Sequence, residues 1–141
     1  MRGPSERSVG EHELMAAMVA QRNSCPFCIG DHGAVAAKCM TRPLVGAALS
    51  AFRSEPTSES LKAALAFLEI MTLRPMELSA THAKAAIDSG VTTAGALEDA
   101  IAAGAVFNIV MRYASALDFA LPSAKEFDRA AGMLLKRGYA A

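Results

Sequence analysis

Two cysteines and one histidine near the N-terminus are the residues of this sequence best suited to chemistry. Cys25 and Cys28 are separated by two residues, and His32 follows Cys28 by four, about one helical turn. Glu13 lies twelve residues before Cys25 and is followed by apolar residues only, up to Ala20. Thiols, an imidazole and a carboxylate at these spacings can support either thiol redox chemistry or metal binding.

The spacing favours redox chemistry. Pro26 suits the first position of a helix, so Cys25 and Cys28 would share its first turn and could close a disulfide. Unpaired N–H groups and the helix dipole favour a thiolate there. His32 would lie on the same helix face as Cys28 and could accept its proton or stabilise its thiolate as imidazolium. Glu13 is the best candidate to orient this imidazole.

The pairing of Cys28 with His32 predicts different roles for the two thiols. Cys28 is expected to attack the substrate, and Cys25 to resolve the resulting sulfenic acid as a disulfide. A thioredoxin-like arrangement would instead make the first cysteine the nucleophile, but that fold needs strands, and the sequence shows no strand alternation. Glu13 at a wet helix end and His32 as a solvated helix residue are the alternatives without a function.

A zinc site is the competing interpretation, since Cys25, Cys28, His32 and Cys39 are all zinc-ligand types. In a continuous helix Cys39 would lie about 16 Å along the axis from Cys28, too far for one ion. The remaining three could still bind a metal, but we expect no bound metal or cofactor. Cys39 is predicted to be a small buried apolar residue.

The composition indicates one all-α domain. The chain has 141 residues, 52% of them hydrophobic and only 6% aromatic, with zero formal net charge. Many small apolar residues favour closely packed helices, and the charge balance gives no reason to expect nucleic acid as a partner. No uninterrupted apolar run is long enough for a membrane span, and no signal peptide is evident, so we expect a cytoplasmic protein without membrane contact.

Apolar periodicity and capping residues predict a bundle of about six helices in a single domain over residues 1–141, with residues 1–8 loose. Gly104 is a possible kink in the long apolar helix near the C-terminal end, and His12 and His82 are expected at the surface. The expected helices run from near Val9 to Arg22, from Pro26 to Arg42-Pro43, which ends or kinks this helix before a short further segment over Leu44–Phe52, over Glu59–Leu73, from Ser79 to Gly90, from Val91 to about Asp118, and from Ser123 to near Gly138.

The Glu13, Cys25, Cys28 and His32 pattern resembles the redox motif of the AhpD-like alkylhydroperoxidases, a branch of the carboxymuconolactone decarboxylase-like family. Other parts of the chain that are similar to this family are Gly33–Ala36, Leu65–Leu68 ahead of Thr72, Gly90–Thr92, and Phe107-Asn108 with Arg112. Two positions depart from the family pattern. Phe27 stands where the best-known members have a further histidine, and Met111 replaces a second asparagine.

The resemblance implies an all-α fold and a homo-oligomer, often a trimer or hexamer. It implies an oxidoreductase that reduces hydroperoxides, with Cys28 peroxidatic, Cys25 resolving, and His32 and Glu13 relaying protons. No cofactor would be bound; an external lipoyl-type dithiol, possibly on a lipoyl protein, would reduce the disulfide again. Two alternatives are a non-redox enzyme of the decarboxylase type using His32 and Glu13, and a dithiol protein that responds to oxidants without turnover.

Asn108, Arg112 and Ser115 form a polar stripe in the otherwise apolar helix that ends near Asp118. A charged guanidinium in such a helix needs an acid or carbonyl oxygens as partners. We expect a structural contact within the helix or between subunits, rather than a role in substrate binding.

Overall fold

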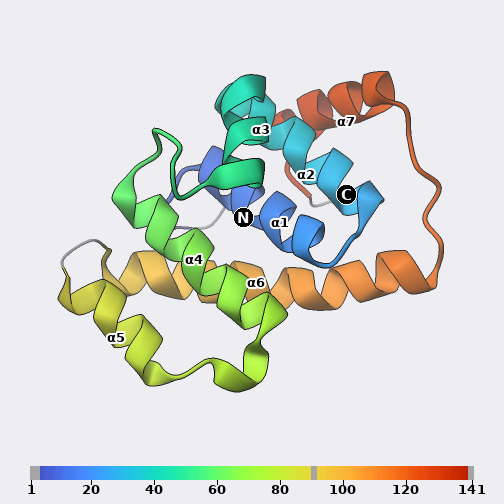
Figure 1. The fold of residues 1–141 in the computed structure, drawn as a ribbon. Coiled ribbons are helices and arrows are strands. Elements are labelled where there is room, and N and C mark those ends of the chain that lie inside the picture. Colours follow the sequence, from blue (N-terminus) through green and yellow to red (C-terminus); the bar gives the residue numbers. More distant parts are fainter. Residues whose placement is uncertain (1–3, 90–91, 140–141) are drawn as a thin grey trace.

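A computed structural model describes residues 4–89 and 92–139 of the protein, and these fold into seven α-helices and one short 3-10 helix, without a strand. The predicted all-α class is therefore confirmed (Figure 1). Gly90 and Val91, where one predicted helix ends and the next begins, lie outside the described residues. The elements are α1 Val9–Arg22, α2 Pro26–Cys39, α3 Arg42–Ala51, α4 Glu59–Leu73, η1 Pro75–Glu77, α5 Ala80–Asp88, α6 Ala94–Ala116 and α7 Ala124–Arg137.

Helix α1 lies at the centre of the bundle, in contact with α2, α3, α4 and α6 (Figure 1). Every side chain from Glu13 to Ala20 is fully buried. A helix that is apolar on all sides can be stable in water only when other elements surround it, as observed here. Its N-terminus carries a capping box in which the Ser8 side chain accepts from Glu11 N and the Glu11 carboxylate accepts from Ser8 N.

The turn between α1 and α2 sets the geometry of the thiols. Ser24 has φ 54°, in the left-handed region, and Cys25 N donates to Ala20 O at 3.0 Å, which ends α1. Cys25 is the N-cap of α2, and Pro26 occupies the first helical position, as predicted. With only three residues between the helices, α1 and α2 pack side by side, so residues on their facing sides meet.

Helix α6 spans the molecule without a break, so the kink considered at Gly104 is absent. A Cβ at Gly104 would lie 2.6 Å from Leu68 Cδ2, too close for any side chain. The glycine therefore permits close packing of α6 on α4.

By length and composition alone, α6 is long and apolar enough to cross a membrane. A core helix of a water-soluble protein can have the same length and composition, so this observation is weak evidence for a membrane span. Here one side of α6 packs on α1 and α4. The opposite side exposes large apolar side chains, which we call the outer face of α6: Ile101, Ile109 and Tyr113.

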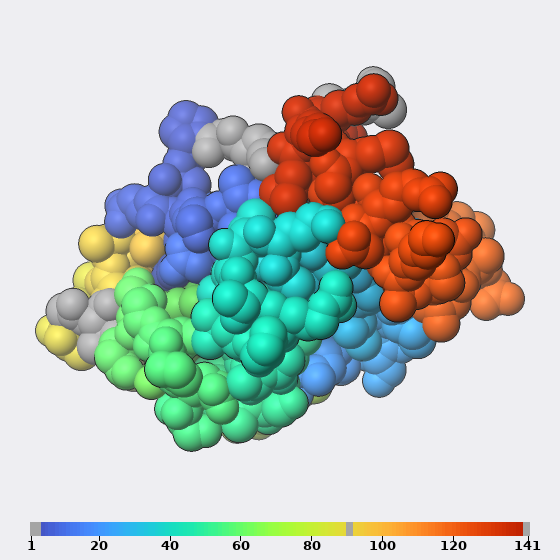
Figure 2. Space-filling model, turned by 90° about the horizontal axis from the view of Figure 1, so that it is seen from above, coloured from blue at the N-terminus to red at the C-terminus, as the bar shows by residue number. Residues whose placement is uncertain are grey.

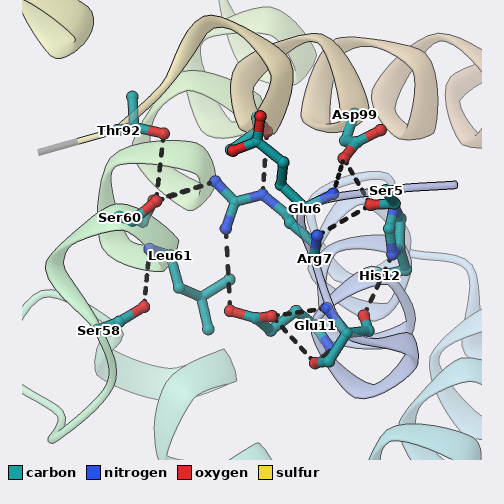
Figure 3. A network of polar contacts seen from close by, with 12 residues as sticks. Ser5, Glu6, Arg7, Glu11, His12, Ser58, Ser60, Leu61, Thr92 and Asp99 are labelled. Atoms are coloured by element: carbon teal, nitrogen blue, oxygen red, sulfur yellow. Dashed lines mark hydrogen bonds and ion pairs between the residues drawn. The ribbon is translucent and has the colours of Figure 1, made fainter.

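Residues 5–7 are held against the bundle rather than loose, as Figure 3 shows. The Arg7 side chain is buried, and its Nε donates to Ala96 O at 3.0 Å. Ser5 Oγ donates to Asp99 Oδ2 at 2.5 Å, and Thr93 Oγ1 donates to Glu6 Oε2 at 2.5 Å. The prediction of a loose segment is thus wrong for these residues, because the buried guanidinium of Arg7 and the carboxylates of Glu6 and Asp99 anchor them to the bundle. Residues 1–3 lie outside the described part of the chain.

Helices α2, α3 and α7 lie together on the side of the molecule seen in Figure 2. Helix α7 begins with the predicted capping box of Ser123 and Glu126 and packs on α2. Phe127 and Ala131 of α7 are buried in a small second core with Ala34 and Val35 of α2. This packing brings the residues that follow α7 back toward α1 and α2.

Candidate active site

Glu13 and His32 form a buried pair between α1 and α2. Glu13 is 0% exposed and His32 5% exposed, and His32 Nδ1 lies 2.9 Å from Glu13 Oε2. A carboxylate accepts hydrogen bonds only, so Nδ1 carries the proton in this contact and Nε2 is the nitrogen left to act on other groups. The possibility that Glu13 sits at a wet helix end is therefore excluded. The His32 ring also packs edge-on against Phe107, with centroids 4.5 Å apart.

The two thiols lie in contact at the start of α2. Cys25 and Cys28 are both buried and free, and their sulfur atoms are 2.7 Å apart. Cys25 caps the helix and Cys28 is the third helical residue, so the first turn holds the side chains together. Only a small displacement separates this arrangement from a disulfide, whose S–S distance is about 2.05 Å.

The resting state does not favour a Cys28 thiolate, contrary to the prediction from the helix start. Burial, and to a lesser extent the Cys25 thiol and the Asp31 carboxylate, raise the pKa of Cys28 to about 12, although a backbone hydrogen bond acts in the opposite direction. Desolvation thus outweighs the helix terminus. Among the described residues, no hydrogen bond joins Cys28 to His32, although both line one cavity. Ionisation of Cys28 therefore requires proton transfer to a group that enters or turns toward it.

A cavity of about 790 Å³ opens at the exposed side of this site. Cys28 and His32 lie in its wall, as does Phe27, and most of the lining surface is apolar. The remaining apolar wall comes mainly from α6, with Phe119 from the segment after it. The α6 residues that line the cavity are Ala102, Ala103, Val106, Phe107, Val110 and Ala114.

Asp31 is a charged residue of this cavity that the sequence interpretation did not use. Desolvation raises the pKa of its carboxyl, and the charge of Glu13 adds to this effect, while His32 opposes it. Asp31 lies one turn after Cys28, and its negative charge opposes a thiolate there. Asp31 therefore belongs to the electrostatic surroundings of the thiol.

Tyr139, just beyond the end of α7, is a further site residue that sequence reasoning missed. Its hydroxyl donates to Glu13, with distances of 2.9 Å to Oε2 and 3.1 Å to Oε1, and lies 3.3 Å from His32 Nδ1. Gly138, with φ 74°, turns the chain toward the site. Nothing in the sequence near Tyr139 signals this contact, because it depends on how α7 packs on α2.

Two residues outside the pair, Cys39 and His12, differ from expectation, whereas His82 lies at the surface as expected. Cys39 is exposed rather than buried, because it is the last residue of α2. His12 is buried rather than at the surface, with Nδ1 3.1 Å from Ser8 O, and it lines the cavity. His82 is half-buried and caps α5 by accepting from Ser79 N at 3.3 Å.

The polar stripe of α6 has a structural role. Asn108 Nδ2 donates to Thr72 Oγ1 at 3.2 Å and to Gly104 O at 2.9 Å, and its Oδ1 accepts from Asn23 Nδ2 at 3.0 Å. Arg112 is exposed and donates to Asn108 O. Asn108 thereby joins α6 to α4 and to the α1–α2 turn, and Arg112 makes the contact within its own helix that was predicted.

No metal centre is found within residues 4–89 and 92–139, where no three histidine, cysteine, aspartate or glutamate side chains are grouped to hold an ion. Cys39 lies at the far end of α2 from Cys25 and Cys28. The zinc interpretation therefore gains no support from the geometry.

Comparison with solved structures identifies the fold. An uncharacterized peroxidase-related protein from Silicibacter sp. TM1040 superposes with a TM-score of 0.80 at 24% sequence identity, over 91% of this chain and 66% of the other. An uncharacterized peroxidase-related protein with an alkylhydroperoxidase AhpD core, from Ralstonia eutropha JMP134, gives a TM-score of 0.79 at 20% identity, over 93% and 68%. The chain has the AhpD-like fold.

The AhpD-like chain spans about two thirds of the length of these two proteins. No protein-family model and no curated protein matches its sequence. Identities of 20% and 24% establish the fold alone, so the activity has to be argued from the residues of this chain. The fold assignment confirms the resemblance that the motif around Cys25 and Cys28 suggested.

Proposed function

We propose that the protein is a thiol-dependent peroxidase that reduces hydroperoxides through Cys28 and Cys25. The observation that carries the proposal is that two free sulfurs lie 2.7 Å apart and that one of them, Cys28, lines a cavity together with His32 of the buried His32–Glu13 pair. The names of the structural neighbours, peroxidase-related proteins and an AhpD core, support the same class of reaction.

In the first step the Cys28 sulfur attacks the terminal oxygen of ROOH and the O–O bond breaks. Cys28 becomes a sulfenic acid, and the alkoxide leaves as ROH after taking up a proton. His32 is suited to accept the thiol proton at Nε2 and return it to the leaving oxygen, because Glu13 holds the proton of Nδ1. The thiol is not ionised at rest, so proton transfer must accompany attack.

In the second step the Cys25 thiol attacks the sulfenic sulfur of Cys28. A disulfide forms and water leaves, which requires little movement because the two sulfurs are already in contact. An external dithiol, for which a lipoyl-type group is our proposal, then reduces the disulfide by exchange and becomes a disulfide itself. No bound cofactor is needed for this electron balance.

The apolar wall of the cavity suits a hydroperoxide with an organic R group. The chamber holds about 790 Å³ and is lined by Phe27, Phe107 and Phe119 beside the thiol, so an alkyl or aryl group can displace water there. A small peroxide would leave most of this surface wet.

The decisive experiment measures consumption of cumene hydroperoxide with dihydrolipoamide as reductant. Wild type should turn over, Cys28→Ser should be inactive, and Cys25→Ser should accumulate a sulfenic acid on Cys28 that dimedone traps. Cys39→Ser is the matched control, because Cys39 is an exposed thiol at the other end of α2. Activity retained in Cys28→Ser, with a dimedone adduct on Cys25, would reverse the roles.

Two other functions are tested by the same assay. A decarboxylase-type enzyme would use His32 and Glu13 as acid–base groups and would show no dependence on Cys25 or Cys28. A redox-responsive dithiol protein would react once with peroxide and would not turn over with a dithiol. The buried contact between the two sulfurs favours the peroxidase over the first alternative.

We further propose that the protein is a cytoplasmic homo-oligomer, a trimer or hexamer, in which the outer face of α6 is covered by another copy. Ile109 is 59% exposed and Tyr113 65% exposed on this helix, which is more apolar surface than one helix of a monomer usually leaves in water. Neither a nucleic acid nor a membrane is proposed as a partner.

A further inference from the structure

The C-terminal segment Arg137–Tyr139 lies in the wall of the cavity that contains Cys28 and His32. It comes from the end of α7, more than a hundred residues away from the thiols in sequence. It reaches the site because α7 packs on α2, and because Gly138 adopts φ 74° and ψ −168°, a conformation that only glycine accepts readily.

The Tyr139 hydroxyl completes the hydrogen bonding of Glu13. Among the described residues, Glu13 Oε2 receives both His32 Nδ1 and the phenol, whereas Oε1 receives the phenol alone. Glu13 is 0% exposed, so no bulk water can replace the phenol without a change in structure. A buried carboxylate that loses a donor is left with an unsatisfied oxygen, which is costly, and its side chain is held less firmly.

We propose, as an extension of the peroxidase function, that Tyr139 is a positioning residue whose phenol holds the Glu13 carboxylate in place and aims it at His32. The carboxylate in turn orients the His32 imidazole, the group suited to take up the Cys28 proton. Tyr139 thus acts on the thiol through two intervening side chains and does not itself touch the reacting sulfur.

The other titratable and charged groups at this site come from four elements and remain unchanged in the test below. They are His12 on α1, Cys25 at the N-terminus of α2, Cys28 and Asp31 on α2, Asp99 on α6, and Arg137 at the end of α7.

The test is a double-mutant cycle between Tyr139 and Glu13, read out as the rate of Cys28 alkylation against pH. Tyr139→Phe removes one hydroxyl and should slow alkylation at pH 7.5 about threefold or more, the equivalent of half a pKa unit in thiolate. In a Glu13→Gln background the same change should add nothing, because the charge that the phenol supports is already gone.

The matched control is Tyr113→Phe, which removes the same hydroxyl from the other tyrosine of the chain, on the outer face of α6. It should leave the alkylation profile unchanged. Gly138→Ala keeps the phenol but disfavours the turn that delivers it, and should slow alkylation in the same direction as Tyr139→Phe. Helical circular dichroism establishes that each variant is folded.

Unchanged alkylation in Tyr139→Phe would overturn the proposal. Slowing that is equally large in the Glu13→Gln background would also overturn it, because an effect of the hydroxyl that does not pass through the Glu13 carboxylate is additive. Alkylation needs no peroxide, so the outcome is independent of turnover. A protein that passes this test but consumes no hydroperoxide would disprove the peroxidase function and leave the role of Tyr139 intact.

Discussion

Replacement of Glu13 by glutamine tests whether the buried pair controls the thiol. The carboxylate lies 2.9 Å from His32 Nδ1 and is 0% exposed, so its charge acts on the imidazole with little screening. For charge centres about 4 Å apart, an effective dielectric of about 20 gives an attraction of about 4 kcal/mol. Desolvation offsets part of it, and hydrogen bonds to charged groups contribute about 1.5–3 kcal/mol net.

A free energy in this range corresponds to about a 10- to 100-fold change in an equilibrium constant. Glu13→Gln removes the charge that acts on His32, so loss of the Cys28 proton becomes less favourable. We therefore expect Cys28 alkylation at pH 7.5 to slow about 10- to 100-fold. The difference should narrow as the pH rises, since hydroxide then removes the thiol proton without help from His32.

Stability should change little, because glutamine can accept from His32 through its amide oxygen and donate to the Tyr139 oxygen. The assay is fragment-resolved mass spectrometry of iodoacetamide labelling between pH 6 and 10, with the exposed Cys39 as internal reference. Glu98→Gln, the same change at an exposed position of α6, is the control. Superimposable Cys28 curves for wild type and Glu13→Gln would refute the role of the pair.

Three further predictions concern stability and assembly. Gly30→Ala should destabilise the protein by about 1–3 kcal/mol, because its Cβ would lie 2.4 Å from the Phe127 ring. Gly33→Ala is the control, because a Cβ there would meet no atom within 4 Å, and thermal unfolding compares the two variants. Because the pKa of Cys28 is raised from about 9 to about 12, the free energy of unfolding should fall progressively as the pH rises from about 9 to about 12. In urea unfolding, the free energy of unfolding of Cys28→Ser should therefore depend less on pH over this range. Ile109→Lys should reduce the assembly to smaller species by light scattering; a wild-type monomer would contradict the proposed oligomer.

The Glu13–His32 pair could be predicted from sequence because both residues belong to one helical hairpin. The α1–α2 turn is three residues long, so the helices must pack side by side, and the apolar run after Glu13 places the carboxylate where it needs a partner. Local signals of this kind also predicted that α1 begins near Val9 and that α7 begins after Ser123.

Features that depend on distant packing were missed. Tyr139 lies 107 residues from His32 in sequence, and only the docking of α7 on α2 brings them together. The continuation of an apolar stripe suggested that Cys39 is buried, but α2 ends at that residue. Periodicity describes which residues share a helix face and carries no information about where neighbouring elements stop covering it.

The raised pKa of Cys28 limits which reactions the buried thiol can perform readily. A thiol with a pKa of about 12 is almost fully protonated at neutral pH, so it reacts slowly with any electrophile that merely diffuses into the cavity. A hydroperoxide differs from such an electrophile because its leaving oxygen needs the proton that the thiol must lose. His32, held by Glu13, can transfer that proton from the Cys28 thiol to the leaving oxygen within the same step. Burial that suppresses the free thiolate therefore selects for reactions in which proton loss and proton gain are coupled, and peroxide reduction is one of them.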